Sequence, residues 1–537
     1  MQLRALAERR PAVAVPRDRR AVIVVAAVVL VVLVVLIAGS GGQAETPPAT
    51  GAASVVPSDA LAYIHVSTDE SRPAVTSALA LAARFPGYAA LRNSLLDRLG
   101  ITGPGVAVNF DSEIRPWLGE QVALAVFDTP TTTAGSLIVA AVANRRAADR
   151  FIAGLPADGS ASYEGTTITG HPGAGDTAFV GHYLVVGHSA SIRAAIDVAA
   201  KRSPSLSENP SYQRAGASEP AARAVDAYVS AAGVTRLLIP RHGVIGVLGA
   251  LLYQPTLEGV AVALTPATGG LQVRVNSVLD PQLAHVSPES FTPSLPSSVP
   301  VGAALFLDVT GLNRVLPHLL ATIGIGAQVP KLFKKLGVAL TAEGVNVEQD
   351  VVSLFHRESA VVISTHGTAP VVTVLTRTPD PSQTRTVFAE LEEPLERLFV
   401  PAGSAAGQAP VFNQVMAGGV AAHQLVLAPG LQFDYAVLGN KVVLSTSLSG
   451  IAGVARHASS ILDQPAYQQS LGDRPARVTS LLFLDLSQLL RLDEQTGLIT
   501  GARFLALKPD IERIHAIGLD STSGEAESTA ELFLQIP

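Results

Sequence analysis

The sequence has no cysteine, one tryptophan and few charged residues for a chain of 537 residues. Without cysteine there can be no disulfide, zinc–thiolate site, iron–sulfur cluster, cysteine nucleophile or lipid-modified cysteine. Charged residues make up only 15% of the chain, where an average soluble domain carries about a quarter, and hydrophobic residues make up 48%. This composition excludes a mostly disordered chain, and the length is that of roughly three or four ordinary domains.

A long apolar run lies near the N-terminus. Ala21–Ala38 contains 18 uncharged residues, and a helix of that length spans roughly 27 Å, about the thickness of a bilayer core. Residues 1–20 hold six arginines and two acidic residues. Because positive charge collects on the cytoplasmic side, the sequence predicts a cytoplasmic basic tail (1–20), a transmembrane anchor (21–38) and an extracytoplasmic C-terminal part.

The alternative for this segment is a cleaved signal peptide. Signal peptides have an apolar stretch of about 7–15 residues and an A-x-A-like cleavage site, whereas this run is longer and leads into GSGGQAE. We therefore expect an uncleaved, single-pass anchor in the cell membrane. The residues after the basic tail carry a formal charge of −10, so we expect no nucleic-acid partner, because binding to phosphates needs basic surfaces.

The rest of the chain contains an internal repeat. Residues 39–54 are rich in Gly, Pro and small polar residues and are predicted to be a flexible linker. Five segments then recur in the same order, which predicts a duplicated ectodomain with repeat unit 1 at 55–285 and repeat unit 2 at 286–537. The pairs are Val56–Val66 with Val299–Val309, Leu96–Leu124 with Phe333–Val361, His182–Ala200 with Asn440–Ala458, Ala227–Leu238 with Leu481–Leu492, and Leu257–Leu264 with Ile511–Leu519.

Each unit is predicted to be α+β with mainly antiparallel sheets. Strands joined by Gly/Pro turns, with helices inserted irregularly, favour this class over a doubly wound α/β fold. The strands expected in unit 1 are Ala60–Val66, Val122–Phe127, Leu137–Val142, Leu184–Gly187, Val260–Leu264 and Leu271–Val278, and the expected helices are Pro73–Arg84, Tyr88–Leu99, Ala147–Leu155 and Ser191–Lys201.

The anchor and three ectodomain segments together resemble a known family. These segments are VPSDALAYIHVSTD (Val56–Asp69), FPGYAALRNSLLDRLG (Phe85–Gly100) and PWLGEQVALAV (Pro116–Val126). The sequence is similar to an actinobacterial, membrane-anchored family catalogued as a domain of unknown function (DUF3352-like). The resemblance implies an anchored topology and an envelope location, and it brings no catalytic residues.

One motif could carry hydrolytic chemistry. Gly187-His188-Ser189-Ala190-Ser191 follows an apolar strand and precedes a helix, which is the setting of a nucleophile elbow. Ser191 stands where the tight turn of that motif requires glycine. The second unit has Ser447 at the position of Ser189 but lacks the Gly-His pair before it. We therefore expect Ser189 to cap the helix that follows it. The alternative is an exported serine hydrolase that uses Ser189.

The other polar candidates are interpreted as structural. The histidines show no metal-binding spacing, His171 and Asp176 lie in a Gly-rich turn that we expect to be solvated, and no phosphate loop is present. We expect no metal and no cofactor. The acidic pairs Asp111/Glu113 and Glu348/Asp350 fit the first turn of a helix, and Trp117 is predicted to lie in the core.

Two apolar stretches, Val244–Tyr253 and one within Leu312–Val338, are too short to span a bilayer. They are expected to be buried, to line an apolar pocket or to rest on a membrane surface. The sequence therefore predicts a non-enzymatic envelope protein that binds a partner protein, an envelope polymer or a lipid-like ligand. A purely structural spacer is the third hypothesis.

Overall fold

The fold is described from a computed structural model of the chain. It covers residues 46–88, 110–172, 175–239, 256–282, 289–312, 338, 341–342, 345, 352–366, 369–398, 410–428, 431–456, 458–496 and 508–537. None of the helices within these ranges is long and apolar enough to cross a membrane. The predicted anchor (21–38), the basic tail, the residues Glu348 and Asp350, the expected helix after Tyr88 and nearly all of the two apolar stretches lie outside the described residues.

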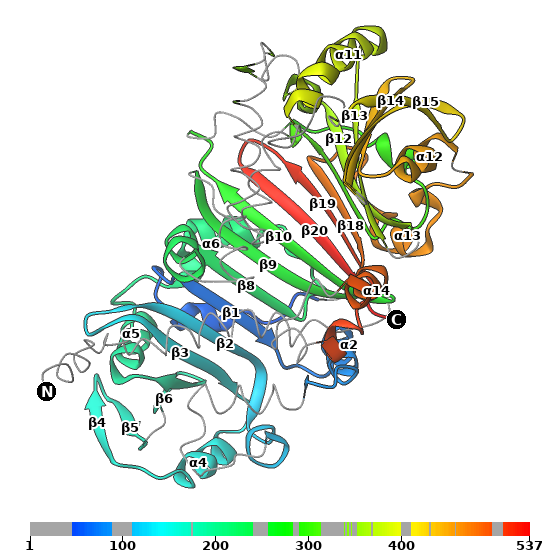
Figure 1. The fold of residues 1–537 in the computed structure, drawn as a ribbon. Coiled ribbons are helices and arrows are strands. Elements are labelled where there is room, and N and C mark those ends of the chain that lie inside the picture. The colour runs from blue at the N-terminus through cyan, green and yellow to red at the C-terminus, as the bar shows by residue number, and fades with distance from the viewer. Residues whose placement is uncertain are drawn as a thin grey trace, which may run out of the picture.

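Twenty strands of the described chain form one antiparallel sheet, which runs as a band through the molecule (Figure 1). The first ten strands are β1 (Ala62–Ser67), β2 (Leu118–Thr129), β3 (Thr132–Val142), β4 (Gly159–Tyr163), β5 (Thr166–Gly170), β6 (Asp176–Val180), β7 (Tyr183–Gly187), β8 (Val225–Ser230), β9 (Leu257–Ala267) and β10 (Gly270–Leu279). The other ten are β11 (Leu305–Thr310), β12 (Glu358–His366), β13 (Ala369–Arg377), β14 (Phe412–Ala417), β15 (Val420–Ala428), β16 (Leu431–Leu438), β17 (Lys441–Ser445), β18 (Ser480–Asp485), β19 (Ala516–Ser523) and β20 (Glu527–Gln535). The α+β class and the antiparallel pairing expected from the sequence are thereby confirmed.

The two halves of the sheet have the same strand order. Starting from the outer edge, the first half runs β4-β5-β6-β7-β3-β2-β1-β8-β9-β10. The second half runs β14-β15-β16-β17-β13-β12-β11-β18-β19-β20 from its own outer edge. Each strand of the first half therefore has a counterpart in the second half at the same place in the order.

The halves join through their last strands. β10 pairs antiparallel with β20 from Gly270 opposite Gln535 to Val278 opposite Glu527. At the midpoint of this seam Arg274 lies opposite Glu531, and the two side chains form an ion pair. Because equivalent strands meet antiparallel and pair about their common midpoint, the seam has the geometry of a pseudo-twofold interface.

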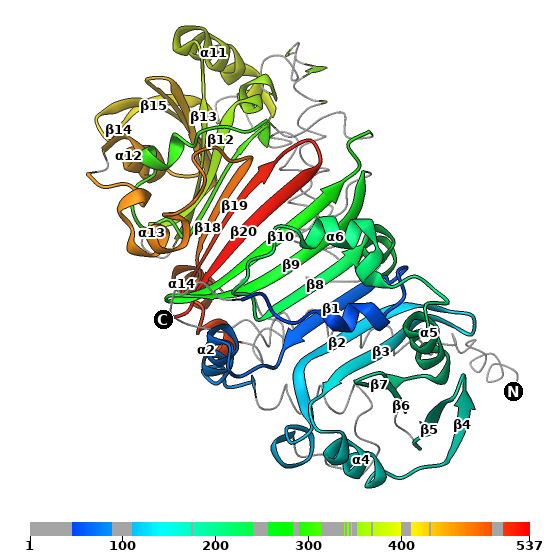
Figure 2. The ribbon, with the colours of Figure 1, turned by 180° about the vertical axis from the view of Figure 1, so that it is seen from behind.

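Helices lie on both faces of the sheet. They are α2 (Pro73–Ala82), α4 (Arg145–Ala153), α5 (Ser189–Ala199), α6 (Pro210–Gly216), α7 (Ala231–Gly233), α11 (Pro381–Leu398), α12 (Leu448–Arg456), α13 (Pro465–Leu471) and α14 (Leu486–Thr496). Short helical turns are η1 (Gly51–Val55), η2 (Phe110–Ile114), η3 (Leu206–Glu208), η4 (Val234–Leu238), η5 (Leu295–Ser298), η7 (Val352–His356) and η8 (Ile461–Asp463). From behind, α5 and α6 are seen over the first half and α12 and α13 over the second (Figure 2).

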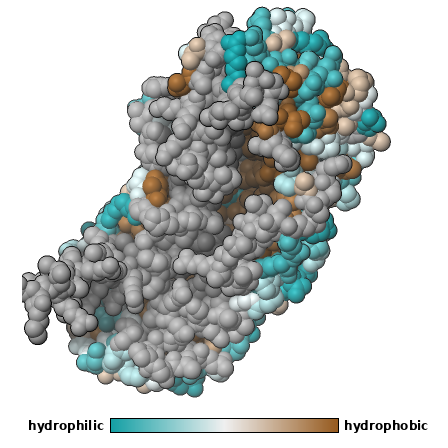
Figure 3. Space-filling view, in the orientation of Figure 1, coloured by the Kyte–Doolittle hydropathy of each residue, from teal (hydrophilic) through white to brown (hydrophobic). Residues whose placement is uncertain are grey.

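Alternation along the strands supplies a separate core on each face of the first half. On β1, Ile64 points toward the face that carries α2, whereas Tyr63 points toward α5 and α6. In Figure 3, apolar side chains also gather in a recess over β18, β19 and β20. The end of the predicted linker belongs to this packed structure, because Ala52 and Ala53 of η1 are buried and the Ala52 N–H donates to Gln121.

Candidate functional site

The main candidate site is an apolar cavity in the first half, between α2 and the sheet. It has a volume of about 600 Å³. Its interior is lined by apolar side chains of α2 and of strands β1, β2, β3 and β8. They include Ile64, Val66, Val75, Ala78, Ala82, Val122, Leu124, Ile138 and Val225. We refer to this space as the α2 cavity.

Local sequence rules explain the shape of the α2 cavity. α2 begins at Pro73, which is well placed at the first helical position because its missing N–H needs no partner there. Val75, Ala78 and Ala82 lie three and seven residues apart and therefore share one helix face. The small alanines on that face leave space between the helix and the sheet.

Charged side chains gather at the mouth of the α2 cavity. The lining includes the carboxylates of Asp69, Glu70, Asp111 and Glu120, and the guanidinium of Arg115. Arg115 bonds to Glu70 at 2.9 Å and to Asp111 at 3.5 Å. Hydrogen bonds from Ser71 hold the pKa of Asp69 below its usual range. The mouth is therefore acidic, with four carboxylates around one arginine.

A buried polar cluster lies on the opposite face of the same strands. His65 on β1 faces Asp226 on β8, and His65 Nδ1 lies 2.9 Å from Asp226 Oδ1, with both side chains buried. The Nε of Arg223 donates to the same Asp226 oxygen at 3.0 Å and also lies 3.1 Å from a carboxylate oxygen of Glu219. His65 Nε2 has no hydrogen-bond partner in the described structure.

The two carboxyl groups of this cluster, Glu219 and Asp226, have their pKa values shifted in opposite directions. Burial and the nearby charge of Asp226 raise the pKa of Glu219 to about 8, against the opposing effect of Arg223. Burial also acts to raise the pKa of Asp226, but the charges and hydrogen bonds of His65 and Arg223 outweigh it and lower that pKa. Asp226 is thus the carboxylate that balances Arg223 at neutral pH, whereas Glu219 is protonated.

The second half places a different ionisable residue at the position of His65. The predicted match of Val56–Val66 with Val299–Val309 pairs His65 with Asp308, and Asp308 lies on β11, the counterpart of β1. Asp308 is fully buried, and burial raises its pKa well above the usual range, with a further contribution from Glu358. The opposite residue on β18 is Leu481, so the histidine–aspartate pair occurs in the first half alone at this place.

The serine motif forms the expected strand–turn–helix, but its capping role was predicted wrongly. The N-cap of α5 is His188, whose side chain makes no capping hydrogen bond, and Ser189 is the first helical residue. In the second half, Ser447 Oγ does accept from the Ser449 N–H at 3.3 Å. Within the described chain no histidine hydrogen bond reaches the Ser189 hydroxyl, and the hydrolase alternative stays an untested prediction.

The other predicted residues lie in structural positions. His171 is buried rather than solvated, because its two ring nitrogens bond to the Pro156 carbonyl at 2.8 Å and to the Thr177 hydroxyl at 2.9 Å. Trp117 is buried in the core as predicted, and its N–H donates to the Glu113 carbonyl. Across the described ranges, no group of three or more His, Asp or Glu side chains is arranged to hold a metal ion.

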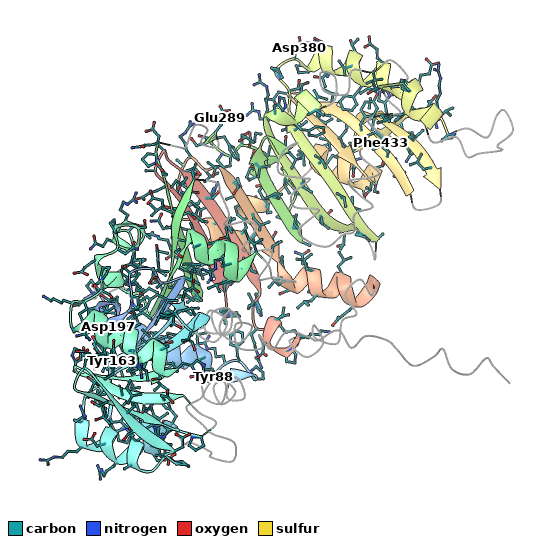
Figure 4. All side chains as sticks on the ribbon, turned by 90° about the vertical axis from the view of Figure 1, so that its left-hand side faces the viewer. Tyr88, Tyr163, Asp197, Glu289, Asp380 and Phe433 are labelled. Atoms are coloured by element: carbon teal, nitrogen blue, oxygen red, sulfur yellow. The ribbon has the colours of Figure 1, made fainter. Side chains whose placement is uncertain are left out.

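The α2 cavity and the His65 cluster were missed in the sequence. A His in AYIHV and an Asp in VDAYV are polar residues inside apolar strands, which is a signal for a buried pair. The cavity has no such signal. Helical periodicity predicts which face of α2 is apolar, but it does not predict the distance between that face and the sheet. Figure 4 shows Tyr88, another lining residue, after α2.

Comparisons with known proteins give a family and no function. A comparison with curated proteins finds no match. A solved structure titled "Structure of crystal form I of TP0453" aligns with 44% of this chain and 82% of that chain, at 13% identity and a TM-score of 0.26, a likeness too low to carry an argument. The actinobacterial origin stays a prediction. The model of a family described as "Protein of unknown function (DUF3352)" matches residues 20–536, so the chain belongs to this family, as its resemblance indicated.

Proposed function

We propose that the protein is a non-enzymatic binding module for an amphiphilic, lipid-like ligand whose apolar part enters the α2 cavity. The observation that carries the proposal is the division of the cavity into an apolar interior and a charged mouth. Ligand pockets are concave and mostly apolar, with a few polar groups that orient the ligand. A volume of about 600 Å³ lies within the usual range of such pockets.

The charge of the mouth selects the head group of the ligand. Asp69, Glu70, Asp111 and Glu120 outnumber Arg115, which is already engaged by two of them. An anionic head group at this mouth meets like charge, whereas a cationic or neutral, hydroxyl-bearing head group finds acceptors. The ligand class that fits is therefore an alkyl chain with a cationic or neutral head.

The location that we propose follows from the N-terminal segment. The apolar run 21–38 after six arginines supports a single-pass anchor with the sheet on the extracytoplasmic side. The family match begins at residue 20 and so includes this run. A module held beside a bilayer is well placed to exchange an amphiphile with it.

We further infer that the two halves descend from one duplicated unit. The identical strand order and the seam between equivalent last strands support this inference. The units then diverged, because the first half has the His65–Asp226 pair and the second half has Asp308 at that place.

Fluorescence quenching tests the proposal in the full-length chain. Trp117 is the single tryptophan and belongs to the same apolar cluster as the cavity-lining Ile64, Leu124 and Ile138. A bromine-labelled dodecyl trimethylammonium salt should quench Trp117 by filling the α2 cavity, and the matching bromo-dodecanoate should quench it much less.

Two variants of α2 separate binding in the cavity from adsorption to the surface. Ala78→Phe places a ring in the cavity, where it takes up part of the space for the alkyl chain, and should weaken quenching by the cationic probe. Ala80 is exposed on the same helix and does not line the cavity, so Ala80→Phe should quench as the wild type does. Equal quenching by the two probes contradicts the head-group assignment, and unchanged quenching of Ala78→Phe contradicts the site.

A further inference from the structure

The second half contains another cavity, which lies outside the proposed site. It has a volume of about 780 Å³ and is bordered by α11, α12 and strands β14 to β17. Its polar lining is Arg385, Gln414, His423, Tyr435 and Lys441, and its apolar lining includes Val437, Leu438 and Val454. We refer to this space as the α11 cavity. In Figure 4, Phe433 marks β16 in this part of the molecule.

Three side chains form a row across the strands beneath α11. Gln414 on β14 lies opposite His423 on β15, and His423 lies opposite Tyr435 on β16. Directly opposite residues of an antiparallel sheet point to the same face. The His423 ring stacks on Tyr435 with 4.6 Å between the centroids, and Phe388 of α11 stacks on Tyr435 at 4.8 Å. These stacks fix the imidazole in place.

Glu392 of α11 holds the histidine by one nitrogen. Its Oε1 lies 2.6 Å from His423 Nδ1 and accepts a hydrogen bond from the Tyr435 hydroxyl, also at 2.6 Å. Burial and the Glu392 carboxylate together raise the pKa of Tyr435, so the phenol stays a donor. With Nδ1 engaged by the carboxylate, Nε2 is the ring nitrogen left for a ligand.

Arg385 supplies positive charge to the same cavity. It lies two turns before Glu392 on α11, so both residues are on one helix face. Arg385 is exposed, and it forms no ion pair within the described part of the chain. The carboxylate of Glu392 is already engaged by His423 and Tyr435. The guanidinium is thus a cation without a counter-charge, and a guanidinium suits a carboxylate or phosphate through two parallel hydrogen bonds.

The fold itself does not require this cluster. The equivalent hairpin of the first half, β5–β6, pairs Ile168 with Ala178 and Thr169 with Thr177. The helix α4, which follows β3 as α11 follows β13, contains no glutamate. The same architecture is therefore built in the first half without the histidine, the tyrosine and their shared carboxylate.

We propose that the α11 cavity binds a ligand with an oxyanion group, a carboxylate or a phosphate ester, attached to an apolar body. The oxyanion accepts hydrogen bonds from the Arg385 guanidinium and the Gln414 amide. It also accepts one from Nε2–H of His423 when the imidazole, whose Nδ1–H is donated to Glu392, carries a second proton. The apolar body rests on Val437 and the aromatic stack, which share one face of the sheet. The site differs in charge preference from the α2 cavity, whose mouth is acidic.

Titration calorimetry on the full-length chain tests the assignment with benzoate, phenyl phosphate and benzylamine. Benzoate and phenyl phosphate share an oxyanion on an aromatic ring, and whichever binds more tightly identifies the group. Benzylamine has a ring of the same size with the opposite charge and should give no heat of binding. Absence of binding by both oxyanions at millimolar concentration, or equal binding of benzylamine, overturns the proposal.

Variants locate the binding within the cavity. Arg385→Ala and His423→Gln should each lower the affinity for the tighter-binding oxyanion at least tenfold, since each change removes a charge-assisted hydrogen bond. Arg397→Ala on the same helix is the matched control, because Arg397 pairs with Glu393 and does not line the cavity. Arg385 and Arg397 are both exposed, so neither change should alter the circular dichroism spectrum. Wild-type affinity in Arg385→Ala contradicts the site.

Discussion

The buried carboxyl of Glu219 should make the first half less stable as pH rises. Its side chain is only 11% exposed, and its pKa is raised from 4.5 to about 8 by burial and by Asp226. Below pH 4.5 both the folded and the unfolded chain bind this proton. Between that pH and about 8 the unfolded chain loses the proton while the folded chain keeps it, so the free energy of unfolding falls by about 1.4 kcal/mol per pH unit.

Glu219→Gln removes this dependence, because an amide has no proton to lose in this range. From pH 5 to pH 7 the wild type should lose about 3 kcal/mol of unfolding free energy relative to the variant. Titrating groups elsewhere are common to both proteins and cancel in the comparison. The unfolding free energy of the variant minus that of the wild type should therefore be larger at pH 7 than at pH 5.

Urea unfolding followed by Trp117 fluorescence measures this difference, since the single tryptophan lies in the core of the first half. Glu164→Gln is the control, because Glu164 is an exposed carboxylate of the same half that pairs with Arg202 at the surface. The control should follow the wild type at both pH values. If the wild type and Glu219→Gln lose stability in parallel from pH 5 to 7, the protonated state assigned to Glu219 is wrong.

Three further substitutions test the packing, the seam and the second half. A Cβ at Gly233 would collide with the Leu61 carbonyl, so Gly233→Ala should lower the free energy of unfolding by about 1–3 kcal/mol in urea titrations followed by Trp117 fluorescence. Arg274→Glu and Glu531→Arg should each lower the melting temperature, and the double exchange should recover about 1 kcal/mol of coupling; strictly additive effects contradict the seam pairing. Because burial raises the pKa of Asp308, its carboxyl adds to the stability that the wild type loses as pH rises above the ordinary aspartate range, and melting curves of Asp308→Asn should show a smaller loss than those of the wild type.

Strands with strong apolar patterns could be predicted from the sequence. Ala60–Val66 and Leu271–Val278 correspond to β1 and β10 within a few residues. β4 and β5 were missed, because GSASY and TTITG are short and rich in Ser, Thr and Gly, and GSASY is largely exposed. Their strand state comes from pairing with neighbouring strands, which overrides weak local preference.

Long-range contacts explain most of what the sequence did not show. The seam pairs Gly270 with Gln535, residues far apart in the chain, and no local pattern specifies such a partner. His65 and Asp226 are likewise brought together by the pairing of β1 with β8. For Ser189 the sequence predicted the turn correctly and the cap wrongly, because a shift of one residue moves the cap position to His188.

The position of β20 has a consequence for the order of synthesis. β20 follows the other described strands in the chain, and it fills the space between β10 and β19. Domains assemble from the N-terminus as the chain emerges, so both halves expose an unpaired sheet edge until β20 has been made. A premature stop before Glu527 would remove β20 and open two sheet edges at once. Such a truncated chain should aggregate, although the first half would keep all ten of its strands and the second half nine.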